Sequence, residues 1–153
     1  MEPALPDEPS EPERWPSGIQ EYVLPGGWRV LVGRTASAND QLSLKIARPN
    51  DRWFHIRGMP GSHVVLRVPE GATPDRATQE LAAAIAAFHS KARSAGTVGV
   101  SCTEARHVSK PPNAKPGTVT IRKETVLKVQ PLSESALAGF RRDSPIQHRE
   151  RDS

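Results

Sequence analysis

One long helical pattern, set among short strand patterns, constrains the fold of this chain most strongly. Apolar side chains between residues 74 and 95 recur at spacings of three and four, which places them on one face of a helix. Thr73 is the expected N-cap, and Gly96 is the expected end of the helix. Lys91 and Arg93 then fall in the last turns, where cations are favoured. The expected apolar face consists of Ala77, Leu81, Ala84, Ile85, Phe88 and Ala92.

Short strand patterns lie on both sides of this helix. One of them alternates apolar Leu42, Leu44 and Ile46 with Ser43 and Lys45, a period of two that indicates a strand with one buried face. Strands joined by short turns pair antiparallel. We therefore predict an α+β fold, a mostly antiparallel sheet with one long helix packed on it. The expected strands are residues 22–24, 28–32, 42–46, 53–57, 63–68, 98–102, 106–109, 118–122 and 125–129.

The length and composition predict one domain between two tails. A chain of 153 residues can bury an adequate core as a single domain. Residues 1–17 are rich in proline and acid and cannot bury enough apolar surface to fold, so we expect a disordered acidic tail. Residues 18–131 form the expected domain. Residues 132–153 form a C-terminal extension, in which a short helix or docked turn precedes a frayed, partly disordered end.

Charge is distributed unevenly along the chain and points to an anionic partner. Residues 14–130 contain 17 Lys or Arg against 8 Asp or Glu, a net charge of +9. A polyanion such as RNA, DNA or an anionic membrane surface suits such a domain, with the cations gathered on one exterior patch. The proline-rich segment 110–117 is expected to be an exposed basic loop that contacts phosphates. A basic protein without any such ligand is the alternative at this stage.

The cysteine content and hydropathy predict a cytoplasmic protein. Cys102 is the only cysteine, so an internal disulfide is impossible and a reducing compartment fits. No run approaches the ~18 apolar residues of a membrane span, and the N-terminus lacks the features of a signal peptide. We expect neither export nor membrane insertion.

The segment 33–66 concentrates polar and aromatic side chains near turn positions, where a fold alone has little need of them. RNA or another nucleic acid is the leading ligand class, because cations can contact phosphates and flat rings can stack on unpaired bases. Trp53 and Phe54 are neighbours in an expected strand and point to opposite faces, so at least one of them should lie in the core.

A small hydrolase, metal-dependent or serine-dependent, that uses His55 and His63 is the alternative from the residues alone. Ser62 and His63 are adjacent in an expected strand and should face opposite ways, and no HxH or HExxH spacing is present. We therefore expect no enzyme, no metal and no cofactor. A protein-interaction module, whose basic face meets an acidic partner, is the third possibility.

Two blocks of residues carry a resemblance to a known family. The first block contains Gly33-Arg34, Ala36, Asn39-Asp40, Leu42, Asp51, Trp53-Phe54-His55 and Pro60 to Val64, and the second contains Ser90 to Arg93, Val108, Lys110-Pro111, Ala114 to Gly117 and Val119. Over about residues 20–130 the chain resembles the NFACT RNA-binding domain, often called NFACT-R. The order and number of these motifs make the resemblance far more specific than a lone glycine motif.

The resemblance implies contact with RNA, with tRNA or rRNA as the ligand in a ribosome-associated or quality-control setting. The large ribosomal subunit is a further partner that the family suggests. The chain has no room for the other domains of the large quality-control factors, so we expect a stand-alone version of the module, and tRNA recruitment and tail synthesis do not follow. The expected RNA-binding residues are Arg34, Asn39, Asp40, Arg52, Trp53, His55, Arg57, Ser62, His63, Lys91, Arg93, Lys110 and Lys115.

Overall fold

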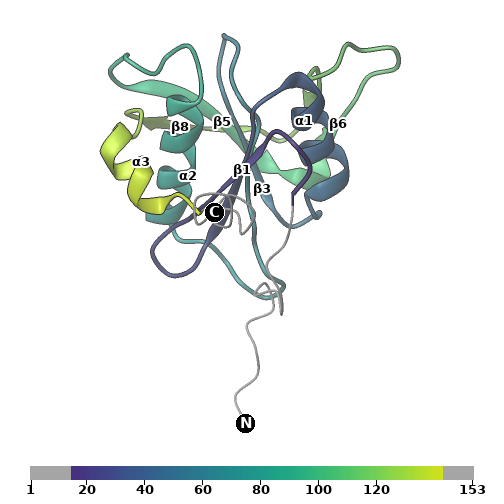
Figure 1. Cartoon of the computed structure of the whole chain (residues 1–153). Helices are drawn as coiled ribbons and strands as arrows, with labels where there is room; N and C mark the ends of the chain where they lie inside the picture. The colour runs from purple at the N-terminus through teal and green to yellow at the C-terminus, as the bar shows by residue number, and fades with distance from the viewer. Residues whose placement is uncertain (1–14, 143–153) are drawn as a thin grey trace, which may run out of the picture.

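The computed structural model describes residues 15–142, which form an antiparallel sheet covered by helices on both faces (Figure 1). The main sheet has six strands in the order β1-β2-β4-β3-β5-β8, and every neighbouring pair is antiparallel. Its strands are β1 (Ile19–Val23), β2 (Arg29–Gly33), β3 (Arg52–Ile56), β4 (Val64–Leu66), β5 (Val98–Glu104) and β8 (Thr125–Val129). The other elements are α1 (Ala36–Gln41), η1 (Leu42–Ile46), α2 (Arg76–Phe88), η2 (Ala105–His107), β6 (Val108–Ser109), β7 (Thr120–Ile121) and α3 (Glu134–Phe140).

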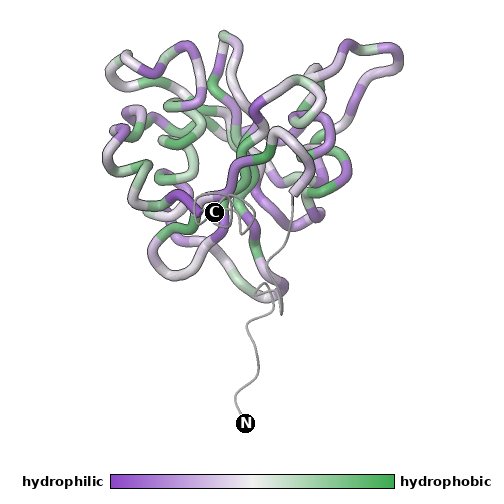
Figure 2. The backbone as a smooth tube through the Cα atoms, in the orientation of Figure 1, coloured by the Kyte–Doolittle hydropathy of each residue, from purple (hydrophilic) through white to green (hydrophobic). Residues whose placement is uncertain are grey.

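The larger core lies between one face of the sheet and the helices α2 and α3. Phe54 and Ile56 of β3 contact the apolar face of α2, in which Ile85 is completely buried. Leu137 of α3 joins the same cluster. Figure 2 shows that the apolar stretches concentrate on the central strands and on α2, while the outer loops are mostly hydrophilic. Burial of this surface is the main driving force for the fold.

A smaller core on the opposite face holds α1, η1 and the β6–β7 hairpin against the sheet. Leu31, Leu42, Trp53 and Val65 are its buried members. Neighbouring strand residues point to opposite faces, so Phe54 lies in one core and Trp53 in the other. The prediction that at least one of these two rings is internal is confirmed, because both are.

The predicted α+β class and antiparallel sheet are confirmed, but the prediction of a strand at 42–46 is wrong. Thr35 caps a helix there, since its hydroxyl accepts a hydrogen bond from the Ala38 amide, and the helix continues as the wider turns of η1. Leu42 is buried, whereas Leu44 is 36 % exposed. The alternation of apolar residues that indicated a strand therefore does not follow burial.

The long helix is confirmed, but it is shorter than predicted at both ends. Its N-cap is Asp75, whose carboxylate accepts a hydrogen bond from the Thr78 amide, and not Thr73. The helix ends at Phe88, and Ser90 then bonds to the Ala87 carbonyl and accepts from the Ala92 amide. Lys91 and Arg93, predicted in the last turns, and Gly96, predicted as the end, therefore lie beyond the helix. Ala77, predicted on its apolar face, is exposed.

The two ends of the described chain pack on β1 and β2. Trp15 lies within the segment predicted as an acidic tail, and its indole donates a hydrogen bond to Glu21. The guanidinium groups of Arg29 and Arg67 lie 5.7 and 5.5 Å from the centre of the Trp15 ring. The predicted short C-terminal helix is present as α3. The remaining parts of the two predicted tails, residues 1–14 and 143–153, lie outside the described residues. No helix within residues 15–142 is both long enough and apolar enough to cross a bilayer.

A buried ion pair ties the start of β3 to the end of β4. Asp51 is fully buried, and its carboxylate accepts hydrogen bonds from the Arg67 guanidinium at 3.0 Å, the Arg48 amide at 2.8 Å and the Val68 amide at 2.9 Å. Arg67 is 3 % exposed and also donates to the Ile46 carbonyl. Breaking a buried pair leaves an uncompensated charge in the interior, which costs much more than an exposed pair contributes.

We therefore expect Asp51→Ala to lower the free energy of unfolding by roughly 3 to 5 kcal/mol. The control Glu80→Ala removes the exposed ion pair with Arg76 and should cost roughly 0.5 kcal/mol or less. Urea unfolding curves measure both changes. The double variant Asp51→Ala, Arg67→Met should recover part of the loss, because the unpaired charge is then gone. Equal stability of Asp51→Ala and Glu80→Ala would contradict this account.

Candidate nucleic-acid interface

A pocket of about 550 Å³ opens at one end of the sheet, the upper end in Figure 1. Strands β2 and β3 both pair antiparallel with β4, so they run in the same direction and end at this edge. The loop 57–62, the segment after α2 and the β6–β7 loop reach the same end (Figure 1). The pocket is lined by Gly33, Arg34, Thr35, Ala36, Asn39, His55, Pro60, Gly61, Ser62, His63, His89, Ser90, Lys91, Arg93, Pro116, Gly117 and Thr118.

Among the described residues, three cations line this pocket and no carboxylate does. Arg34 follows β2, while Lys91 and Arg93 follow α2, so two separate segments supply the charge. The guanidinium of Arg93 is oriented by the Phe88 ring, whose centre is 4.1 Å away, and by a hydrogen bond to the Phe88 carbonyl. Within residues 15–142, Arg34 and Lys91 form no ion pair with a carboxylate. The pocket therefore presents a positive field to an anion.

Two glycines let the walls of the pocket approach closely. A Cβ atom on Gly33 would lie 2.1 Å from Oδ1 of Asn39, the atom that accepts a hydrogen bond from the His63 amide. A Cβ atom on Gly61 would lie 2.8 Å from Ile56 and 2.9 Å from Ser90, and Gly61 pairs with Ser90 in an isolated bridge. These two contacts join α1 to the start of β4 and join the 57–62 loop to the end of α2.

His63 is the centre of a buried hydrogen-bond chain below the pocket. Its Nε2 lies 3.1 Å from the Gly117 carbonyl, which can only accept, so Nε2 carries the proton. Its Nδ1 then accepts from the hydroxyl of Ser43 at 2.7 Å, and that hydroxyl accepts from the Trp53 indole at 2.8 Å. Burial, followed by repulsion from His55, lowers the pKa of His63 to about 4. The imidazole is therefore neutral at pH 7.

A second histidine, His89, is held at the end of α2. Its Nε2 lies 2.9 Å from the hydroxyl of Tyr22. Burial lowers the pKa of His89 to about 4, and the nearby charges of Arg34 and Arg93 contribute to this lowering. Burial also lowers the pKa of His55, whose ring lies parallel to the Trp53 ring at a centroid distance of 5.9 Å. At pH 7 all three histidines that line the pocket are uncharged, so its charge comes from Arg34, Lys91 and Arg93.

The β6–β7 loop is fastened to α1 by Asp40. One carboxylate oxygen of Asp40 accepts a hydrogen bond from the Gly117 amide at 2.9 Å, and the ammonium of Lys110 forms an ion pair with Asp40 at 3.1 Å. Lys110 also donates to the carbonyls of Lys115 and Thr118. The Gly117 peptide is thus bonded on both sides, at its N–H by Asp40 and at its carbonyl by His63.

The structure brings only part of the predicted RNA-binding set together. Seven members of that set line the pocket, whereas Asp40 and Lys110 support the loop beside it. Trp53 is 3 % exposed, so its ring has no free face for a base. The seven lining members are Arg34, Asn39, His55, Ser62, His63, Lys91 and Arg93.

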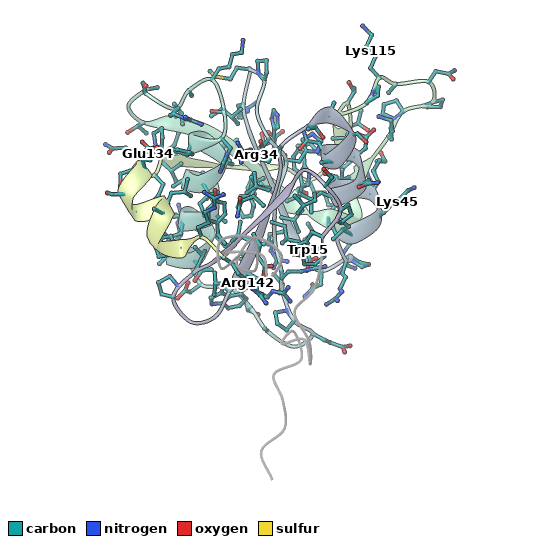
Figure 3. The ribbon with its side chains drawn as sticks, in the orientation of Figure 1. Trp15, Arg34, Lys45, Lys115, Glu134 and Arg142 are labelled. Carbon is teal, nitrogen blue, oxygen red and sulfur yellow. The ribbon has the colours of Figure 1, made fainter. Side chains whose placement is uncertain are left out.

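The remaining cations do not form the single patch that the sequence predicted. Arg52 lies 4.0 Å from Glu104, and Arg57 lies 3.5 Å from Glu124. Lys115 projects outward from the tip of the β6–β7 loop, and Lys45 points away from the body beside η1, both well separated from Arg34 (Figure 3). The loop 110–117, predicted as an exposed basic loop, is exposed at Lys115, but Lys110 is used within the protein.

The serine and histidine of the hydrolase alternative are not arranged as a nucleophile and a base. The histidine His63 bonds to a different serine, Ser43, and both are buried at 3 % and 5 % exposure. Ser62 instead donates its amide to the His89 carbonyl. Within residues 15–142 no three His, Cys, Asp or Glu side chains are grouped to hold a metal ion. His89 was not predicted as a site residue, because no spacing pattern connects it to the 33–66 segment.

Comparison with known proteins shows that the chain is similar to one family. The family model of the NFACT protein RNA binding domain matches residues 21–123. The chain is 39 % identical over 119 residues to the Rqc2 homolog RqcH of Bacillus subtilis, and 39 % identical over 105 residues to that of Streptococcus suis. These matches cover 78 % and 69 % of this chain but only 20 % and 19 % of the relatives. The chain therefore corresponds to about a fifth of their length.

A solved structure confirms the similarity of the fold. The C-terminal part of the fibronectin/fibrinogen-binding protein from Streptococcus suis superposes with a TM-score of 0.77 at 34 % sequence identity. The match covers 87 % of this chain and 53 % of that one. The similarity thus extends beyond the segment that the family model matches.

The hydrogen-bond chain predicts which nitrogen of His63 carries the proton. We expect the neutral Nε2–H tautomer between pH 7 and pH 5, because the pKa of about 4 lies below this range. Two-dimensional proton-nitrogen NMR of the imidazole distinguishes the two tautomers and the charged form. The urea-unfolded chain is the control, since its histidines should titrate near the ordinary value of about 6.5. Protonation of His63 above pH 6 in the folded chain would contradict this assignment.

The same lowered pKa predicts a loss of stability in acid. Below pH 6.5 the unfolded chain gains a proton on residue 63 that the folded chain does not gain until about pH 4. The contribution of His63 is therefore complete above pH 6.5 and is lost as the pH falls toward 4. Between these two pH values the free energy of unfolding can fall by about 1.4 kcal/mol for each pH unit. Urea titrations at several pH values should give a shallower pH dependence for His63→Gln, and an unchanged slope would refute this.

The Asp40 contacts predict a specific loosening of the β6–β7 loop. Asp40→Ala removes the acceptor of the Gly117 amide, so this amide should exchange its hydrogen faster, by an amount that corresponds to roughly 1 to 3 kcal/mol. Hydrogen-exchange NMR measures the change directly. Lys115→Ala in the same loop is the control and should leave the exchange of Gly117 unaltered. If the Gly117 amide exchanges at the same rate in the unmodified chain, in Asp40→Ala and in Lys115→Ala, then Asp40 does not hold the loop.

Proposed function

Because the chain belongs to the family of NFACT protein RNA binding domains, we propose that it binds RNA at the pocket between β2, α2 and the β6–β7 loop. The observation that carries this proposal is the convergence of Arg34, Lys91 and Arg93 in a pocket that no carboxylate of residues 15–142 lines. RNA offers one negative charge for each phosphate, and cations on separate segments can follow a strand. His55 is neutral at pH 7 and only partly buried, so its ring can contact a base or a sugar without adding charge.

The proposed RNA is tRNA or rRNA, in a ribosome-associated or quality-control setting. This part of the proposal comes from the relatives, which are named as homologs of Rqc2, and from the family description. The chain corresponds to a fifth of those relatives, so the proposal concerns the contact with RNA and not the complete activity of the longer proteins. The setting implies a cytoplasmic location and the large ribosomal subunit as a partner.

We propose that the chain is a binding module and not an enzyme. The buried pairing of His63 with Ser43 and Gly117 supports this role, because every polar atom of the imidazole is engaged in holding the fold. RNA recognition needs positioned charges and flat groups, and it needs no nucleophile. We assign the pocket cations and His55 to binding, and we assign His63, Asp40 and Lys110 to positioning of the adjacent loop.

A protein ligand is the second candidate, because the similar Streptococcus suis protein is named for the binding of fibronectin and fibrinogen. A positive pocket can also receive an acidic peptide segment. Pull-downs before and after nuclease treatment distinguish the two candidates. Capture of ribosomal RNA that is lost with nuclease supports the RNA proposal, while capture of the same protein partner after nuclease treatment supports the second candidate.

The pocket cations predict which variants weaken RNA binding. Arg34→Gln and Lys91→Gln should each lower the affinity for tRNA or rRNA fragments roughly three- to ten-fold at low salt. Each should also reduce the slope of log affinity against log salt by about 0.7 to 0.9, the value for one lost phosphate contact. Fluorescence anisotropy at several salt concentrations measures both quantities.

Lys45→Gln is the matched control, because it removes the same charge from an exposed position beside η1 that lies away from the pocket (Figure 3). Its affinity and salt slope should equal those of the unmodified chain. If Lys45→Gln weakens binding as much as Arg34→Gln does, then net charge and not the pocket determines the affinity. If no RNA binds at low salt, the proposed function is wrong.

A further inference from the structure

The pocket is considerably larger than a phosphate group requires. A volume of about 550 Å³ lies within the range of roughly 300 to 1,000 Å³ that is typical of small-molecule sites. Its walls are fixed by the close contacts at Gly33 and Gly61 and by the two hydrogen bonds to the Gly117 peptide. A pre-formed cavity of this size has room for a phosphate together with a sugar and a base.

Charged and flat groups occupy different parts of the lining. The cations come from the end of β2, at Arg34, and from the segment after α2, at Lys91 and Arg93. The flat group comes from the end of β3, at His55. A nucleotide has the same division, because its charge is confined to the phosphate and its base is a neutral flat ring.

Two neighbouring rings fix the orientation of the His55 imidazole. Its ring is parallel to the Trp53 ring within 12°, and it is nearly perpendicular to the His63 ring at a centroid distance of 5.6 Å. His55 is partly exposed, and it lines the pocket. An oriented aromatic ring on one wall is the arrangement on which a base can stack.

We propose that the pocket accepts one unpaired nucleotide of an RNA strand, with its phosphate at Arg34, Lys91 and Arg93 and its base against His55. This inference rests on the proposed function and narrows it to a class of RNA. In a stem the bases are paired and stacked inside the helix, so a concave pocket between loops cannot receive them. A loop, a bulge or a strand end can place a single nucleotide outside the stack.

The first experiment compares two forms of RNA on the unmodified chain. A short single-stranded oligonucleotide should bind at least about ten-fold more tightly than the blunt duplex of the same sequence. AMP at millimolar concentration should displace the labelled single strand, and on its addition the amide signals of Gly61, Ser62 and Ser90 should shift in NMR spectra. An affinity for AMP that equals the affinity for the single strand would identify a free nucleotide as the ligand and would overturn the assignment to an RNA strand.

The second experiment tests whether the His55 ring contacts the base. His55→Ala should weaken binding of the single strand roughly five-fold or more, which corresponds to the loss of one stacked base. His55→Phe retains a flat ring and should stay within about two-fold of the unmodified chain. Circular dichroism and the NMR spectrum establish whether each variant is folded, and the AMP competition on the unmodified chain tests the proposal without any substitution.

The outcomes separate this inference from the proposed function. If the single strand and the duplex bind equally and AMP displaces neither, the nucleotide pocket is wrong, although RNA binding remains. Weak binding of both His55→Ala and His55→Phe would also overturn the role of the ring. If neither RNA binds, the proposed function itself fails. Preferential single-strand binding, AMP displacement and recovery in His55→Phe together support the inference.

Discussion

The arrangement of the pocket depends on a histidine that is buried without a charge. In the neutral imidazole of His63, Nε2 donates to the Gly117 carbonyl, which can only accept, and Nδ1 therefore accepts from the Ser43 hydroxyl. Through these bonds it connects the start of β4 with η1 and with the β6–β7 loop, and Ser43 extends the connection to Trp53 in β3. A charged imidazole at this position would carry a proton on Nδ1 as well, so Ser43 could no longer donate to it and the hydroxyl proton of Ser43 would need another acceptor.

Neutral histidines also decide where the positive charge of the protein acts. Two sets of basic side chains among the described residues have contrasting roles. Arg29 and Arg67 are buried in ion pairs with Glu21 and Asp51, and their charge is compensated inside the fold. Within residues 15–142 no carboxylate lines the pocket beside its cations, so their field is available to an external anion. Net charge counted along the sequence does not distinguish cations that are compensated inside the fold from cations that can act on a ligand.

Much of the fold was predictable because the pattern of buried residues follows the secondary structure. Alternating apolar residues and turn sequences identified the strands of the main sheet, and the apolar spacing around Ile85 identified α2. The segment 42–46 was misassigned because the residues Leu42, Leu44 and Ile46 fit a period of two in the sequence, whereas packing buries Leu42 and exposes Leu44. The C-terminal end of α2 was misplaced because tertiary pairing of Gly61 with Ser90 competes with continuation of the helix.

The site was predictable in its residue types but not in its geometry. Sequence patterns identified the segment 33–66, but the convergence of Arg34, His55 and His63 follows from the strand order β2-β4-β3, which a local pattern does not contain. Two strands that flank a third antiparallel partner must end at the same edge, and the loops that follow them must meet there. His89 and Arg93 join them only because α2 packs with its C-terminal end at this edge. The function of such a module is therefore determined by topology, which brings short segments of modest individual character into one pocket.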